Sequence, residues 1–100
     1  MGMIEKRLEA NASRWLKNQG AYVVKMQAGP GVPVGAPDRM FFYKGRWGAI
    51  EFKAGPDAKF QLNQEATLAH LQSWNSFVYV AYPENWRLIQ NDLQARFFTI

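Results

Sequence analysis

The chain has 100 residues, which suit one domain over residues 1–100 with a single, modest core. Apolar residues make up 48% of the sequence and aromatic residues 15%, which excludes a disordered chain. The absence of cysteine excludes disulfides and thiolate metal sites. No apolar run reaches the length of a membrane span, and the N-terminus lacks the apolar region of a signal peptide. We therefore expect a cytoplasmic protein with no membrane partner.

The net charge of +4 is unevenly distributed along the chain. Residues 1–53 carry nine Lys and Arg against four Asp and Glu, whereas residues 54–100 carry three against four. A basic surface around a few acidic groups suits a polyanion held over a metal centre. The alternative is an ordinary solvated surface of mixed charge.

Residues 3–19 are predicted to form an amphipathic helix, because apolar residues recur there at helical spacing and Gly20 follows. Glu5 lies along the apolar stripe of this helix. It either reaches water from the edge of the stripe or points into a site, and Glu9 is the alternative candidate for the second role. A short strand is predicted over 21–27. The Gly- and Pro-rich residues 28–37 then predict an irregular loop, which either touches a ligand or simply connects two strands.

Two strands, over 39–43 and 46–53, are predicted to form a hairpin around Lys44-Gly45-Arg46. Side chains alternate along a strand, so Glu51 and Lys53 project from one face. The hairpin would bring Asp38 back to the neighbourhood of Glu51. Two carboxylates beside one ammonium form a compact site for a hard divalent cation and an activated water.

A second helix is predicted over 62–74, with Gln64 on its inner face, where it either holds Lys53, a ligand or a phosphate or bonds to the backbone. His70 is offset from that face and is expected to be exposed, and Asp57 is expected to serve a turn or helix cap. A buried strand over 77–82 and a helix over 83–95 follow. The apolar residues 97–100 must then pack on their own domain or on a partner.

The motifs together resemble those of the PD-(D/E)xK nucleases, and their order is most similar to the VRR-NUC branch, the virus-type replication-repair nuclease domain. Glu5 on a first helix precedes Gly35-Ala36-Pro37-Asp38, which stands at the family's Gly-x-Pro-Asp. Ile50-Glu51-Phe52-Lys53 stands at its Glu-x-Lys, and Lys59 to Gln64 resembles a segment that ends in a Gln at a helix start. Ala36 and the residues 60–63 depart from the family pattern.

The resemblance implies an α/β fold, with a restriction-endonuclease-like α-β-β-β-α-β core, a mixed sheet flanked by helices, and a C-terminal helix. It implies a metal-dependent endodeoxyribonuclease in which Asp38, Glu51 and the Phe52 carbonyl bind Mg²⁺ or Mn²⁺. Lys53, Glu5 and Gln64 would be the remaining catalytic residues, with Lys53 acting on the attacking water. The predicted contacts to nucleic acid are those of the following basic residues: Lys6, Arg7, Arg14, Arg39 and Lys59.

The partner implied by the resemblance is DNA, and branched DNA such as a Holliday junction in particular. We expect a homodimer that acts in DNA repair, in a bacterial or phage-infected cell. The alternative from another class is a non-catalytic nucleic-acid-binding module that has the same fold. A protein-interaction domain with an incidental motif is a third interpretation, and it predicts no metal binding.

Overall fold

The computed structural model describes residues 2–27 and 29–99, and over these the chain is a mixed α/β domain. Within that part of the chain, no helix is both long and apolar enough to cross a membrane. The described residues form three helices and four strands, which follow one another in the predicted order. They are α1 (Met3–Asn18), β1 (Tyr22–Lys25), β2 (Arg39–Tyr43), β3 (Arg46–Phe52), α2 (Gln64–Trp74), β4 (Val78–Ala81) and α3 (Trp86–Arg96).

The four strands form one sheet in the order β1-β2-β3-β4. The first three are antiparallel neighbours, and β4 pairs with β3 in parallel through the crossover helix α2. The predicted elements are confirmed, although several end one to three residues away from their predicted bounds. The clearest case is α2, which begins at Gln64 because Asn63, with φ 66°, adopts a left-handed conformation that a helix does not accept.

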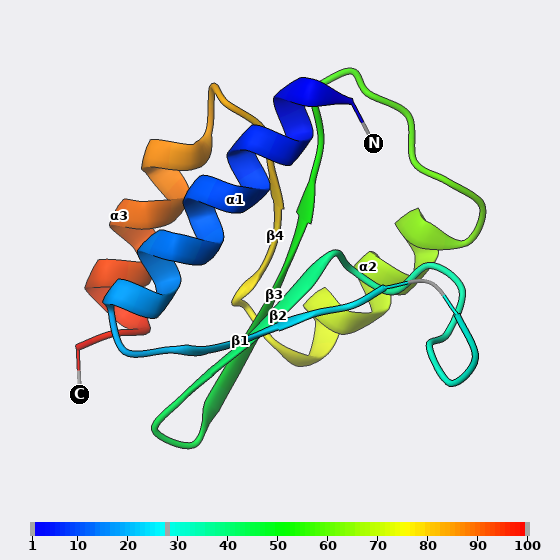
Figure 1. Cartoon of the computed structure of the whole chain (residues 1–100). Coiled ribbons are helices and arrows are strands. Elements are labelled where there is room, and N and C mark those ends of the chain that lie inside the picture. Colours follow the sequence, from blue (N-terminus) through cyan, green and yellow to red (C-terminus); the bar gives the residue numbers. More distant parts are fainter. Residues whose placement is uncertain (1, 28, 100) are drawn as a thin grey trace.

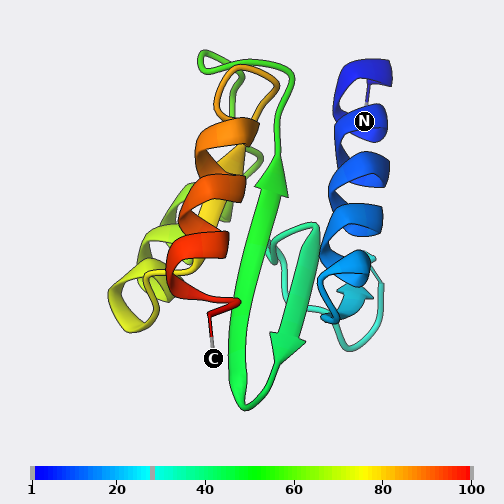
Figure 2. The ribbon, with the colours of Figure 1, turned by 90° about the vertical axis from the view of Figure 1, so that its left-hand side faces the viewer.

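Helices cover the two faces of the sheet unequally. In Figure 1, α1 and α3 lie together on one face and α2 lies on the other, and Figure 2 shows α1 and α3 side by side along the strands. The larger core fills the space beneath α1 and α3 around Phe41, Ile50 and Phe52. The smaller core, built on Ala49, Leu68 and Val78, lies beneath α2.

The apolar C-terminal segment packs on its own domain. Phe97 is fully buried, and its ring meets those of Phe41 and Phe77 edge to face, each at 5.0 Å between centroids. Ile100, the last residue of that predicted segment, lies outside the described residues. The tail therefore completes the larger core.

The packing predicts that Gly48 in β3 cannot carry a side chain. A Cβ there would overlap the Phe41 ring and lie 2.7 Å from the Phe77 carbonyl oxygen. We expect Gly48→Ala to lower the free energy of unfolding by about 1–3 kcal/mol through overpacking. Urea denaturation followed by Trp fluorescence measures this. Gly55→Ala is the matched control, because a Cβ at Gly55 would meet no described atom within 4 Å; equal losses in both variants would contradict the prediction.

Candidate active site

The β2–β3 hairpin brings Asp38 and Glu51 together, as the sequence predicted. Asp38 precedes β2 and Glu51 is the sixth residue of β3, so the register places them opposite each other at the open end of the hairpin. The Asp38 N–H donates to Glu51 Oε1 at 3.1 Å, and the Phe52 N–H donates to Asp38 Oδ2 at 2.8 Å. Each carboxylate is thus oriented by the backbone next to the other one.

Burial changes the proton affinity of both carboxylates. The Glu51 side chain is only 5% exposed, and this burial, followed by the charge of Asp38, raises the pKa of Glu51 to about 7. Burial also raises the pKa of Asp38, although the hydrogen bond from Phe52 opposes the rise. The site therefore holds negative charge that its surroundings compensate only in part.

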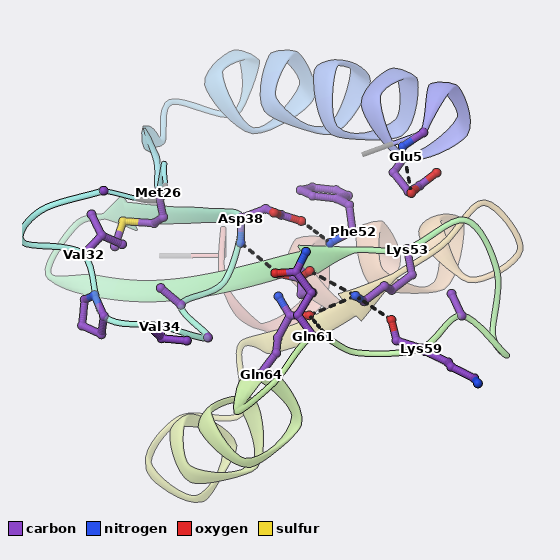
Figure 3. A pocket seen from close by; sticks show the side chains of 17 residues that line it. Glu5, Met26, Val32, Val34, Asp38, Phe52, Lys53, Lys59, Gln61 and Gln64 are labelled. Atoms are coloured by element: carbon purple, nitrogen blue, oxygen red, sulfur yellow. Dashed lines mark hydrogen bonds and ion pairs between the residues drawn. The ribbon is translucent and has the colours of Figure 1, made fainter.

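Lys53 supplies the positive charge beside this pair. Its Nζ lies 3.5 Å from Glu51 Oε2 and donates to Gln64 Oε1 at 2.9 Å and to the Lys59 carbonyl at 3.2 Å. The ammonium also lies 4.9 Å from the centre of the Phe60 ring. Figure 3 shows these dashed contacts converging on Lys53 between the end of β3 and the start of α2.

Gln64 makes contacts of both predicted kinds, one to Lys53 and one to the backbone. It is buried in the first turn of α2, and its side-chain oxygen accepts from Lys53 and more weakly, at 3.4 Å, from the Gln61 N–H. Gln64 is thus a positioning residue for the Lys53 ammonium. The contributions of Phe60 and of the Lys59 carbonyl could not be predicted from the sequence, because both depend on how the loop before α2 folds.

The two acidic residues of α1 have different positions. Glu5 lines the same cleft as Asp38 and Glu51, and its carboxylate accepts from the Gly2 N–H at 3.2 Å. Hydrogen bonds from its own N–H and from Gly2 lower the pKa of Glu5, so it is ionised at neutral pH. Glu9 is buried instead and pairs with Arg39 at 2.7 Å. Of the two candidates, Glu5 is the one whose carboxylate borders the cleft.

A cleft of about 720 Å³ lies over these groups. Its walls are the start of α1, the loop over residues 29–36, and the segment from Ala58 to Gln64 (Figure 3). The loop packs tightly on the start of α2, because Gly35, with φ 87°, leaves room for the Asn63 carbonyl, which would lie 2.8 Å from a Cβ. The loop therefore forms a wall of the cleft, which is the position that a ligand contact, one of its two predicted alternatives, requires.

The predicted nucleic-acid contacts lie in two different environments. Four of these basic residues are exposed, and Lys59 borders the cleft. The exposed ones are Lys6, Arg7, Arg14 and Lys59. Arg39 is instead half-buried, and its guanidinium is held by Glu9. Two further predictions are confirmed: Asp57 is an exposed turn residue, and His70 is exposed on α2.

Comparison of the chain with models of protein families, with characterised proteins and with solved structures found no match. The chemistry of the cleft therefore has to be argued from its own groups. The described residues contain no cluster of three or more His, Cys, Asp or Glu that could hold a metal ion. The donor set is two carboxylates on adjacent strands, which fits a hydrated hard cation bound partly by substrate, and not a closed site such as that of structural zinc.

The raised pKa of Glu51 predicts how stability depends on pH in a chelator such as EDTA. Since the folded-state pKa of about 7 exceeds the ordinary value of 4.5, the folded state binds this proton more tightly. The resulting stabilisation is complete below pH 4.5 and is lost as the pH rises through 7. As the pH rises from 5.5 to 8, the free energy of unfolding of the wild type should fall by about 1–2 kcal/mol more than that of Glu51→Gln. Chemical denaturation at both pH values measures the difference, with the exposed Glu65→Gln as control; parallel losses in wild type and Glu51→Gln would refute it.

Proposed function

We propose that the protein is a divalent-metal-dependent DNA endonuclease that hydrolyses phosphodiester bonds. The observation that carries the proposal is the convergence of Asp38, Glu51 and Lys53 at one end of the hairpin, beneath an open cleft. The order α-β-β-β-α-β-α and the mixed sheet support a restriction-endonuclease-like core of the VRR-NUC kind. The basic first half of the chain supports a polyanionic substrate.

The groups in the cleft fit Mg²⁺ or Mn²⁺ in kind and in charge. Asp38 and Glu51 would hold the ion, with the Phe52 carbonyl as a backbone ligand. Two carboxylates completed by water and substrate phosphate are a usual donor set for Mg²⁺. When bound, such an ion supplies Lewis-acid stabilisation of phosphoryl charge and lowers the pKa of the attacking water.

Lys53 would act directly on the reacting groups. Gln64 and the Lys59 carbonyl hold its ammonium beside Glu51, so its rotamer is fixed before substrate binds. From that position the ammonium can orient the attacking water and neutralise the charge that develops on the phosphate. Glu5, ionised at the rim of the cleft, would hold a water or a second ion.

The preferred substrate in this proposal is branched DNA, and the active form is a homodimer. Two sites related by a two-fold axis match the near-symmetry of a four-way junction. Phe97 of the C-terminal tail fills the core of its own domain, which is the first of the two alternatives predicted for that segment. Sedimentation of the protein with and without junction DNA determines the oligomeric state.

Cleavage of DNA should require the three central residues and a divalent ion. Asp38→Ala, Glu51→Ala and Lys53→Ala should each reduce the rate at least a hundredfold, because each removes a group that acts on the metal or on the transition state. The assay is cleavage of linear, flapped and four-way-junction DNA with Mg²⁺, Mn²⁺ or EDTA. Asp57→Ala is the matched control, since Asp57 is an exposed acidic residue that does not line the cleft.

The outcomes of that assay separate the three interpretations of the chain. Full activity in Lys53→Ala would remove the proposed mechanism. Binding of DNA without cleavage under every metal would favour the non-catalytic binding module. A protein that neither binds DNA nor responds to divalent ions would favour an interaction domain.

Metal binding can be tested without DNA, through stability. An ion bound only by the folded state contributes RT ln(1 + [L]/Kd), about 2.7 kcal/mol at a hundredfold excess over Kd. For a domain of this length, the melting temperature should rise by about 10 °C in millimolar Mn²⁺. Asp38→Asn, which removes one repelling charge at nearly constant shape, should melt in EDTA at or above the wild type and gain less from Mn²⁺.

The control in this experiment is Asp57→Asn, which should respond to Mn²⁺ as the wild type does. If the wild type gains nothing from the ion, and Asp38→Asn is clearly destabilised in EDTA, then Asp38 is a structural residue of the hairpin. The endonuclease proposal would then lose its main support.

A further inference from the structure

A second hollow lies beside the cleft, between the start of α1 and the ends of β1 and β2 that face it. Its volume is about 380 Å³. Lys6, Glu9 and Ala10 line it from the helix, and Lys25 and Arg39 line it from the strands. We refer to this space as the side hollow.

The side hollow and the cleft share a border. Met26 and Asp38 line both of them, and the Met26 N–H donates to the Asp38 carbonyl at 2.9 Å, which extends the β1–β2 ladder by one residue. Figure 3 shows Met26 and Lys59 at opposite ends of the cleft, with Asp38 between them. A DNA strand that crosses the cleft from the Lys59 end over Asp38 therefore arrives at the side hollow.

Two lysines give the side hollow its positive charge. Lys25 and Arg39 are register partners, so both side chains project from the face of the sheet that α1 covers. Glu9 holds the Nε of Arg39 at 2.7 Å, so these two charges offset each other. Lys6 and Lys25 are exposed, and neither forms an ion pair with a described residue. Together they outweigh the single carboxylate of Asp38, and the side hollow keeps a net positive charge without a bound ion.

Helix α1 thus presents opposite charges to two adjacent spaces. Glu5 borders the cleft, whereas Lys6 and Ala10, four residues apart on one edge of the helix, border the side hollow. Ala10 is exposed, and its short side chain leaves the space next to Lys6 open. A cation is favoured in the cleft, and an anion is favoured beside it.

We propose that Lys6 and Lys25 bind the backbone phosphate of DNA next to the phosphodiester that lies at Asp38 and Glu51. A lysine ammonium binds phosphate as a point charge, and contacts to phosphate set the register and orientation of a strand without reading its bases. The proposal rests on the nuclease function and adds the path of the substrate. The strand would run from the Lys59 end of the cleft, over Asp38, and out between α1 and β1.

The alternative is that both lysines are ordinary solvated residues, since a lysine on an edge strand also discourages pairing with other strands. The two interpretations differ in the salt dependence of binding. A lysine that contacts a phosphate releases counterions when DNA binds, and its removal lowers the slope of log Kobs against log salt concentration by about 0.7–0.9. A solvated lysine has no such local effect.

The test measures binding of a fluorescein-labelled four-way junction by anisotropy in EDTA, where no cleavage occurs, from 50 to 200 mM salt. Lys6→Gln and Lys25→Gln should each lower the slope by about 0.7–0.9 and weaken binding about tenfold at 50 mM salt. Lys17→Gln is the matched control, because Lys17 is an exposed lysine in the last turn of α1, outside both spaces, and its loss changes the net charge equally. The control should leave the slope unchanged.

The place of the contact is tested with neutral methylphosphonates at single positions of one junction strand. At one position the wild type should lose about tenfold in affinity, and Lys6→Gln and Lys25→Gln should lose little further, because the contact is already absent. With Mg²⁺, cleavage of the unmodified junction should fall within one or two nucleotides of that position.

An unchanged slope in either variant, an equal change in Lys17→Gln, or equal losses in wild type and variants at every methylphosphonate would overturn the phosphate subsite even if cleavage is confirmed. A contact far along the strand from the cleaved bond would overturn it as well. Binding that shows the expected slopes without cleavage under any metal would retain the subsite and refute the nuclease. A wild type that does not bind DNA would overturn both.

Discussion

The candidate site depends on the two hydrogen bonds that cross the open end of the β2–β3 hairpin. Asp38 donates to Glu51, and Phe52 donates to Asp38, so each carboxylate is held by the strand that carries the other. A slip of one residue would turn one carboxylate to the opposite face of the sheet. The register is fixed at the other end by Lys44 and Gly45, whose φ angles of 49° and 79° are those of a two-residue type I′ turn. A turn that contacts neither carboxylate thereby decides whether the two groups meet.

The balance of charge in the cleft connects its structure with its proposed chemistry. When both carboxylates are ionised, Lys53 offsets one of the two charges, while burial and then the charge of Asp38 raise the pKa of Glu51. A phosphodiester entering alone would add a further negative charge to a buried, negative site. A proton on Glu51 would reduce the negative charge of the cleft, but it would supply no cation to interact with the phosphate. In the proposed function a divalent cation would relieve both, so the groups that destabilise the cleft without an ion would favour a ternary arrangement of protein, ion and phosphate.

Local patterns in the sequence predicted the order of elements and the meeting of Asp38 with Glu51. Periodicity is read within one segment, and the hairpin joins two segments by a short turn, so both could be inferred without the rest of the chain. The Phe60 contact and the burial of Glu9 could not, because each depends on the packing of segments distant in the sequence. The exposure of Tyr22 and Phe42 was also hidden, since aromatic residues in a small domain are ordinarily core residues. Only the register shows that Tyr22 and Phe42 are partners on an open face.

The Glu9–Arg39 pair explains how a domain this small keeps Asp38 in place. Arg39 follows Asp38 directly, and its guanidinium is held at 2.7 Å by Glu9 on α1, with both side chains largely buried. A buried ion pair of this kind gains little net stability, because desolvation of the two charges offsets their attraction. It does fix a geometry, since neither charge can be left unpaired in the interior. The main chain at the start of β2 is thereby tied to α1 on one side and, through the Phe52 N–H and the Asp38 carboxylate, to β3 on the other. We interpret Arg39 as a structural clamp next to the candidate site, a role that its position in a basic segment of the sequence concealed.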